Sequence, residues 1–288
     1  MKKQTEKIPK VIGPKFKEFR KKANVSLKEL AQKVGITSDS ALSRWERGEE
    51  GLPVEIFDRV IASLNISYSE IITNEVEVKQ INEKVDFLYQ KNDTKGLRAL
   101  ATKLLEEYYQ ETDKFLQTEM LIKSAIVINY YMDLTGIDLS DDEYKLKLTQ
   151  QFGNIEFWFK KEIILFANVQ LLLNSSVVYE LSRSLISEMC DKDLVSIDVS
   201  IALLNAIFVL IKQKEPEKAQ SILNGTKQLQ FSSNDLLVKT RIKFMTLLLK
   251  YVETAKDYEI RQFFKSLTDV HLRENCELAF LQIKKIYD

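Results

Sequence analysis

The chain is poor in the residues that break helices and in those that bind metals. Its 288 residues include eight glycines, four prolines, two cysteines and one histidine. So few turn residues leave little room for a hairpin-rich β fold and favour long helices. A single histidine without a cysteine cluster predicts no metal site, and no glycine-rich loop is present to hold a phosphate-bearing cofactor. We therefore expect no catalytic residues and no cofactor, and an enzyme is the least expected class.

Long apolar runs and a net charge are also lacking. The longest apolar run, Ile201 to Ile211, is interrupted by Asn205 and is too short to cross a bilayer, and the N-terminus has no apolar signal region. We expect a cytoplasmic protein with no membrane partner. Cys190 and Cys276 fit a reducing compartment, as buried or half-buried thiols. A composition of 45% hydrophobic and 29% charged residues is typical of soluble globular proteins, and the length predicts two domains.

The charged residues are unevenly distributed along the chain. The 42 basic and 42 acidic residues of the chain cancel, yet residues 1–35 hold eleven basic residues against three glutamates, a net charge of +8. Such an excess at one end predicts a polyanionic partner such as DNA. Residues 1–13 form a basic arm that could lie along phosphates. Alternatively, the arm is a solvated tail that makes no contact.

A helix-turn-helix pattern follows the basic segment. Residues 27–34 carry apolar side chains at helical spacing and end at Gly35, the kind of glycine turn that joins two helices. A short polar helix is expected next, capped by the hydroxyl of Thr37 or Ser38 and stopped by Gly48. The N-terminal end of such a helix faces the major groove in DNA-binding proteins of this type.

The polar faces of this helix and its surroundings supply the candidate DNA contacts. Base reading and phosphate anchoring need hydrogen-bonding or basic side chains near the start of the helix. Arg44 is the strongest candidate, because its guanidinium suits a guanine edge or a phosphate equally well. Asp39 would cap the helix or accept from a cytosine amino group. The predicted set is Lys15, Lys28, Ser38, Asp39, Ser40, Ser43, Arg44 and Arg47. The alternative is a helix-turn-helix kept only for packing.

The same residues carry a family resemblance. Ala31, Gly35 and the Ser-Arg-Trp-Glu-Arg-Gly-Glu stretch at 43–49 resemble the lambda-repressor-like helix-turn-helix domain of Xre type. Within that class the stretch is most similar to the Rgg/GadR/MutR transcriptional regulators. The resemblance implies double-stranded promoter DNA as a partner. It also implies that Arg20 and Glu46 pair inside the domain and are structural.

After residue 72 the pattern changes to helix after helix. We expect a helix-turn-helix domain at 1–72, a linker at 73–78 and a helical repeat and dimerisation domain at 79–288. The predicted helices cover 76–91, 94–110, 112–134, 140–151, 155–173, 175–190, 193–213, 216–229, 232–254, 257–266 and 268–286. Breaks are expected at Gly136, Gly153, Pro216 and Gly225. Short gaps predict antiparallel hairpins, and the fold class is therefore all-α, with an α-solenoid of tetratricopeptide-like hairpins.

Two asparagines, Asn168 and Asn205, lie inside apolar helices, where an unpaired amide is costly. An amide can pair with one peptide unit of an extended chain, while Leu171 and Phe208, three residues further on, supply an apolar wall. The simpler alternative is a hydrogen bond to a neighbouring helix carbonyl or to water. The 158–168 stretch is similar to the matching helix of the Rgg regulators, which implies a groove for a short hydrophobic pheromone peptide. Members known to bind such peptides have an arginine where this chain has Leu171.

These observations combine into one functional hypothesis. The chain is expected to be a transcription regulator that binds promoter DNA as a homodimer and responds to a peptide in its C-terminal solenoid. A dimer is expected because one small helix-turn-helix binds weakly alone. The family implies a dimer contact through the C-terminal helices, with Ile283, Ile286 and Tyr287 as candidates. The alternatives are a repeat domain that binds a protein partner, as in a scaffold or an antitoxin, and a small-molecule-sensing repressor.

Overall fold

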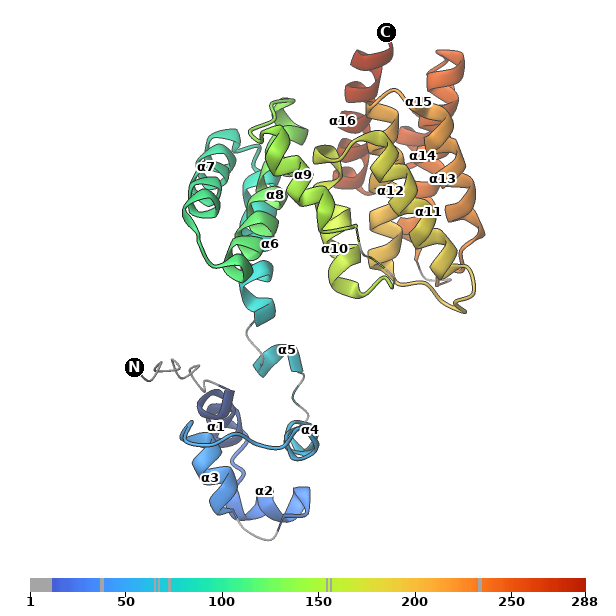
Figure 1. Ribbon diagram of the computed structural model, residues 1–288. Helices are drawn as coiled ribbons and strands as arrows, with labels where there is room; N and C mark the ends of the chain where they lie inside the picture. The colour runs from blue at the N-terminus through green and yellow to red at the C-terminus, as the bar shows by residue number, and fades with distance from the viewer. Residues whose placement is uncertain are drawn as a thin grey trace. The chain divides into compact units, whose positions relative to one another are not determined.

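The computed structural model describes residues 12–36, 39–64, 66, 68–71, 74–153, 155, 157–232 and 235–288. The regular structure in these ranges is helical, without a strand, which confirms the predicted all-α class (Figure 1). Contacts within the chain divide it into an N-terminal unit, 1–83, and a C-terminal unit, 84–288. Helix α6 (Asn74–Gln90) covers most of the segment expected to be a linker. No described helix has both the length and the apolar character needed to cross a bilayer.

In the described part of the N-terminal unit, five helices pack around one small core. They are α1 (Ile12–Lys22), α2 (Leu27–Val34), α3 (Ser40–Glu46), α4 (Val54–Ser63) and α5 (Tyr68–Ile71). Leu42 and Trp45, three residues apart on α3, both face this core. The Trp45 ring packs on the Phe16 ring with 5.0 Å between their centroids. The core therefore holds α3 by one face and leaves its other face polar.

The turn between α2 and α3 contains the predicted glycine. Gly35 has a φ of 73°, in the left-handed region, and ends α2. Helix α3 is shorter than predicted, because it begins at Ser40, and the Asp39 side chain makes no capping hydrogen bond. The capping role considered for Asp39 is thus wrong, while Thr37 and Ser38 lie outside the described residues. Gly48 stops the helix as predicted, with a φ of 72°.

Helix α1 crosses the end of α3 at a point where no side chain fits. A Cβ atom on Gly13 would lie 1.9 Å from the carbonyl oxygen of Trp45. Only glycine allows this approach, which brings Phe16, one turn later on α1, onto the Trp45 ring. Pro14 is tolerated beside it because the first turn of a helix has no use for the missing N–H. The sequence pattern alone had not indicated this crossing.

The predicted pair of Arg20 and Glu46 is confirmed and lies in the interior. Arg20 Nε and Nη2 donate to the two carboxylate oxygens of Glu46 at 2.6 and 2.8 Å. Arg20 Nη1 also donates to the Val25 carbonyl oxygen at 2.6 Å, and hydrogen bonding to Glu46 raises the pKa of the Arg20 guanidinium. The side chains are 9% and 2% exposed. Both residues are therefore committed to joining α1 to α3.

Replacing Glu46 by glutamine would leave the buried Arg20 guanidinium without its counter-charge. We expect Glu46→Gln to lower the free energy of unfolding of the N-terminal unit by about 3 kcal/mol, because a buried ion that loses its partner is strongly destabilising. Hydrogen–deuterium exchange of peptides from α1 and α3, as a function of urea, measures the change. The matched control, Glu18→Gln at an exposed position of α1, should stay within about 0.5 kcal/mol. Equal protection in the two variants would contradict the stabilising role of the pair.

The C-terminal unit is a stack of helical hairpins (Figure 1). Its elements after α6 are α7 (Thr94–Gln110), α8 (Lys114–Thr135), α9 (Asp142–Gln150), α10 (Lys160–Val169), the short 3-10 helix η1 (Gln170–Leu172), α11 (Ser175–Met189), α12 (Ile197–Lys212), α13 (Pro216–Gln228), α14 (Leu236–Thr254), α15 (Tyr258–Ser266) and α16 (Val270–Tyr287). Among the described residues each predicted helix of this unit has a counterpart in the same order, except that the helix predicted for 155–173 is divided into α10 and η1. The predicted starts of α10, α12 and α14 were too early.

Helix α12 is the central element of this unit. It packs against α10, α11, α13, α14 and α16. Its buried residues are Val199, Ser200, Ala202, Leu203, Leu204, Ala206, Ile207, Val209, Leu210 and Ile211. Such a helix, apolar on nearly every side, is stable only inside a stack of other helices.

One predicted helix break and one predicted helix start are wrong, each for an identifiable reason. Gly225 does not break a helix, because it lies within α13, where a Cβ would come within 2.9 Å of Ile186 Cδ1 on α11. The glycine serves a close helix crossing instead. Helix α10 begins at Lys160 because the Trp158 backbone N–H donates to the Glu188 carboxylate at 2.8 Å and its indole N–H to Ser184 Oγ at 3.1 Å. These bonds hold the preceding segment out of the helix.

The cysteines and the C-terminal residues depart from expectation in part. Cys276 is buried, and desolvation raises the pKa of its thiol to about 11, whereas Cys190 is exposed rather than half-buried. Ile283 is fully buried within the C-terminal unit, and the Tyr287 hydroxyl donates to the Ile211 carbonyl oxygen at 2.9 Å. Ile283 is thus core rather than a surface for a second copy of the chain, and the prediction that used it for the dimer contact is wrong.

Candidate DNA-binding surface and ligand cavity

Helix α3 and its neighbours present the polar residues predicted to contact DNA. Ser40 and Arg44 are exposed on α3, Ser43 is half-buried, and Arg47 is exposed at the end of the helix. Lys28 is exposed at the start of α2, Lys15 is half-buried on α1, and Asp39 is exposed just before α3. Ser43, Arg44 and Arg47 form one local group. Ser38 lies outside the described residues, and the roles of the whole set stay predictions.

Two glutamates that the sequence reasoning missed engage the arginines of this group. Arg44 Nε lies 3.0 Å from Glu50 Oε2, and Arg47 Nε lies 2.6 Å from Glu49 Oε1. Arg47 Nη1 also donates to Ser43 Oγ at 2.6 Å. All four charged side chains are about half exposed, at 47% to 51%. Ion pairs at that exposure are worth roughly 0 to 1 kcal/mol, so the arginines can exchange them for another anion.

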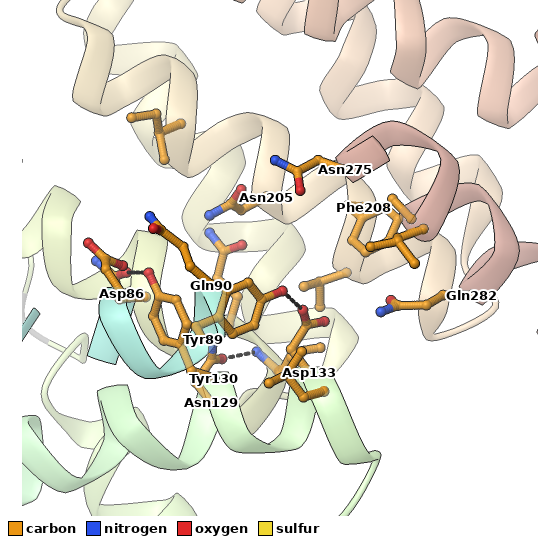
Figure 2. A pocket seen from close by; sticks show the side chains of 18 of the residues that line it. Asp86, Tyr89, Gln90, Asn129, Tyr130, Asp133, Asn205, Phe208, Asn275 and Gln282 are labelled. Atoms are coloured by element: carbon orange, nitrogen blue, oxygen red, sulfur yellow. Dashed lines mark hydrogen bonds between the residues drawn. The ribbon is translucent and has the colours of Figure 1, made fainter. Parts of the chain in front are cut away.

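The C-terminal unit contains a cavity of about 1270 Å³. Residues of α6, α8, α10, η1, α12, α14 and α16 line it, and Figure 2 shows its polar side chains converging from several of these helices. The four residues predicted for peptide binding, Asn168, Leu171, Asn205 and Phe208, all line it and are all half-buried. The structure thus brings the four together in one place, and their role in binding stays a prediction.

The two asparagines make the helix hydrogen bonds that the simpler alternative expected. Asn168 Nδ2 donates to the Ile164 carbonyl oxygen at 2.8 Å, and Asn205 Nδ2 donates to the Ala167 carbonyl oxygen at 3.0 Å. Asn168 Oδ1 accepts from the Tyr130 hydroxyl at 3.1 Å. Within the described part of the chain, Asn205 Oδ1 has no partner. Each amide therefore has one of its two N–H groups engaged, and what Asn205 can offer a ligand is its oxygen as an acceptor and its second N–H as a donor.

Asn129 and Gln170 are two of the other amides that line the cavity. Asn129 Oδ1 accepts from the Leu171 N–H at 2.9 Å, which fixes the junction of α10 and η1. Gln170, which is 1% exposed, donates to the Ala202 carbonyl oxygen at 2.9 Å, and its buried Oε1 has no partner among the described atoms. Asn129 had given the same signal as Asn168, a polar amide in an apolar run, and the sequence reasoning missed it.

Tyrosines and carboxylates occupy the side of the cavity formed by α6 and α8. The Tyr89 hydroxyl donates to the Asp133 carboxylate, which also pairs with Lys212 Nζ on α12 at 2.9 Å. The rings of Tyr89 and Tyr130 meet edge to face with 5.1 Å between centroids. Burial raises the pKa of both tyrosines far above their usual range, so both act as neutral donors. Desolvation also raises the pKa of the Asp86 carboxyl.

Comparison with known families identifies the family to which this chain belongs. Residues 102–278 match the family described as HTH-type transcriptional regulator Rgg, C-terminal domain, and residues 16–71 match the helix-turn-helix family. The chain belongs to the Rgg family of transcriptional regulators. The match covers the cavity residues of α8, α10, η1, α12 and α14, while those of α6 and of the second half of α16 lie outside it.

Solved structures share the fold of this Rgg-family chain at low identity. The SHP pheromone receptor Rgg2 of Streptococcus dysgalactiae has a TM-score of 0.64 and 18% identity, over 96% of this chain and 98% of that chain. PlcR of Bacillus thuringiensis, solved with the peptide PapR7 and DNA, has a TM-score of 0.60 and 14% identity, over 96% and 97% of the two chains. Both likenesses concern the fold.

A curated relative is similar over a shorter stretch. The antitoxin PezA of Streptococcus pneumoniae is 29% identical over 103 residues, which is 30% of this chain. The match covers 65% of the antitoxin's own length. This similarity therefore concerns part of each protein only.

Removing the Asn129 side chain should loosen the cavity wall. In Asn129→Ala the Leu171 N–H loses its acceptor, and we expect the C-terminal unit to lose about 1 to 2 kcal/mol of unfolding free energy, as for an unsatisfied buried donor. Hydrogen exchange at residues 170–172 should rise more than elsewhere. The matched control is Gln90→Ala, which also lines the cavity but is exposed. Unchanged exchange at the α10–η1 junction would show that Asn129 does not hold it.

Proposed function

We propose that the chain is a regulator that binds promoter DNA through α3 as a homodimer and changes its output when a short hydrophobic peptide occupies the C-terminal cavity. The observation that carries this proposal is the convergence of Asn168, Leu171, Asn205 and Phe208 on one cavity of a chain that belongs to the Rgg family. The similar fold of PlcR, which was solved with a peptide and DNA, supports it. In this proposal residues 1–72 read DNA and residues 79–288 bind the peptide and the second copy.

The charge and exposure of the N-terminal unit support DNA binding. Arg44 and Arg47 are exposed next to the polar face of α3, and their glutamate partners are half exposed. A phosphate or a base edge can replace such a glutamate at little cost. Lys15 and Lys28 would anchor phosphates on either side. We expect a homodimer because one short helix in the major groove binds DNA weakly, whereas two copies bound to two half-sites combine their affinities.

The size and lining of the cavity favour a peptide over a small metabolite. Pockets for small ligands usually measure roughly 300 to 1,000 Å³, and this cavity of about 1270 Å³ is larger. Apolar side chains such as Leu134, Ile201 and Phe208 alternate in its wall with amides that suit peptide groups. Leu171 makes the wall apolar where an acidic ligand side chain would need a cation. The expected peptide is therefore hydrophobic at that point.

A protein partner in place of the peptide is the second candidate. The partial likeness to the antitoxin PezA favours it. A short reading frame for a hydrophobic peptide next to the gene would support the peptide proposal. A neighbouring toxin gene, with a protein that co-purifies in equal amounts, would support the second candidate instead.

DNA binding should depend on Arg44 and on salt. We expect Arg44→Ala to weaken binding to the promoter of its own gene about tenfold or more, because one bidentate contact to a base or phosphate is lost. Fluorescence anisotropy with labelled promoter fragments measures this, and the affinity should fall steeply between about 50 and 200 mM salt. Arg98→Ala, an exposed arginine of the C-terminal unit, is the control. Unchanged affinity in Arg44→Ala, or a flat salt profile, would refute the proposed DNA surface.

Peptide retention should depend on Asn205. Mass spectrometry of the protein purified from its own host should detect short hydrophobic peptides, and Asn205→Ala should lose most of them while binding promoter DNA as before. The reason is that the Asn205 oxygen is an acceptor for peptide N–H groups. Asn224→Ala, at an exposed amide of α13, is the matched control and should retain the peptides. Equal retention by both variants would contradict a role for Asn205.

A further inference from the structure

The charged residues that line the cavity are separated into two groups. The carboxylates Asp86 and Asp133 are carried by α6 and α8, whereas the cations Arg241 and Lys285 are carried by α14 and α16. Figure 2 shows Asp86 on the opposite side of the cavity from the α16 residues Asn275 and Gln282. The middle is formed by amides and apolar side chains of α8, α10 and α12. The cavity therefore has an acidic end and a basic end.

At the acidic end Asp86 is the carboxylate without a cation. Asp133 is neutralised by Lys212 Nζ at 2.9 Å and receives the Tyr89 hydroxyl as well. Asp86 makes no ion pair within the described part of the chain, and the Tyr130 hydroxyl is the group that hydrogen-bonds to it. A cation in the cavity would find its counter-charge at Asp86.

The Tyr130 hydroxyl cannot satisfy both acceptors that it contacts. It lies 3.1 Å from Asn168 Oδ1 and also hydrogen-bonds to the Asp86 carboxylate. One hydroxyl carries one proton, so it donates to one of the two acceptors at a time, and the exposed Asp86 carboxylate otherwise depends on solvent. Desolvation raises the pKa of Asp86, and no neighbouring cation opposes that effect. A ligand ammonium group, with three donors and a positive charge, would supply the second donor and a counter-charge for Asp86.

At the basic end the charges are also uncompensated. Arg241 is half-buried and Lys285 is exposed, and neither forms an ion pair with a carboxylate among the described residues. Glu274 is the acid that lines this end, and its side chain lies 3.9 Å from His271. Two cations against one carboxylate leave a net positive charge, which suits a carboxylate of the ligand.

We propose that the cavity accepts a linear peptide with both ends free, its N-terminal ammonium against Asp86 and its C-terminal carboxylate against Arg241 and Lys285. This inference rests on the proposed function and adds to it the direction of the peptide and the requirement for unblocked ends. The reverse direction places like charges together at both ends. The uncharged middle, with Asn205 and Phe208, binds the body of the peptide.

The test compares end chemistries of one probe. The probe is a synthetic pool of octapeptides built from leucine, isoleucine, valine, phenylalanine and glycine, in four forms: free at both ends, N-acetylated, C-amidated, or blocked at both. Equimolar forms are incubated with the full-length protein, and the bound peptides are separated by gel filtration and counted by mass spectrometry. We expect about tenfold enrichment of the free-amine over the acetylated form, and of the free-acid over the amidated form, as for hydrogen-bonded charges.

Variants assign each preference to one end of the cavity. Asp86→Asn should abolish the preference for the free amine and keep the preference for the free acid. Asp86→Glu carries the same charge as the wild type and should therefore show the preference for the free amine again. In the double variant Arg241→Gln, Lys285→Gln the preference for the free acid should be lost and the preference for the free amine should be kept. Asp193→Asn and Arg98→Gln, at exposed positions outside the cavity, are the matched controls and should bind like the wild type.

The outcomes separate this inference from the function on which it rests. Octapeptides that bind without end preference, or with preferences that survive the cavity variants, overturn the proposed direction and leave peptide binding in place. A swapped assignment, with the amine preference lost in the Arg241 and Lys285 variant, overturns it too. No binding of any form to the wild type overturns both the direction and the peptide proposal.

Discussion

The packing of α12 against α10, α11, α13, α14, α16 and the short η1 is the constraint on which the cavity depends. Burial of its apolar side chains contributes roughly 25 cal/mol for each Å² removed from water, so the rotation of the helix about its axis is fixed. Its half-buried positions toward the cavity are Ile201, Asn205, Phe208 and Lys212, spaced by four, three and four residues. That spacing forms one stripe of a helix. This stripe faces the cavity and the ion pair between Lys212 and Asp133, because the other sides of α12 are buried in the core.

Helical periodicity was enough to predict the order of helices but not the partners across the cavity. The starts of α7 and α13 follow directly from local signals, such as Pro216 in the first turn of α13. By contrast, Lys212 pairs with a carboxylate 79 positions away in the chain, and Tyr130 with an amide 38 positions away. Such pairs depend on how hairpins stack, and a degenerate repeat does not specify the stacking. Gly225 was misinterpreted for the same reason, since its close neighbour Ile186 lies on another helix.

The hydrogen bonds of the asparagines limit how they can recognise a ligand. Asn168 and Asn205 donate to carbonyl oxygens of α10, and releasing either donor would cost on the order of 1 kcal/mol. Their oxygens, the second N–H of each amide and the buried Gln170 Oε1 and Gln282 Oε1 are the groups left to take up a partner. Recognition through the oxygens, which are the majority of these groups, asks the ligand for N–H donors. A peptide backbone has one donor per residue, whereas a carboxylate-rich metabolite has few, and this difference favours the peptide independently of the cavity's size.

Pairs of arginine and glutamate have two different roles in the N-terminal unit, and burial decides which role each pair has. Arg20 and Glu46 are less than one tenth exposed, so separating them would leave a desolvated charge, and the pair is permanent. Arg44 with Glu50, by contrast, is about half exposed, and water can replace either partner. Sequence alone could rank Arg44 above Arg20 as a DNA contact only through the family resemblance. The structure gives the physical reason, because an arginine can be exchanged onto a phosphate only where its present partner holds it weakly.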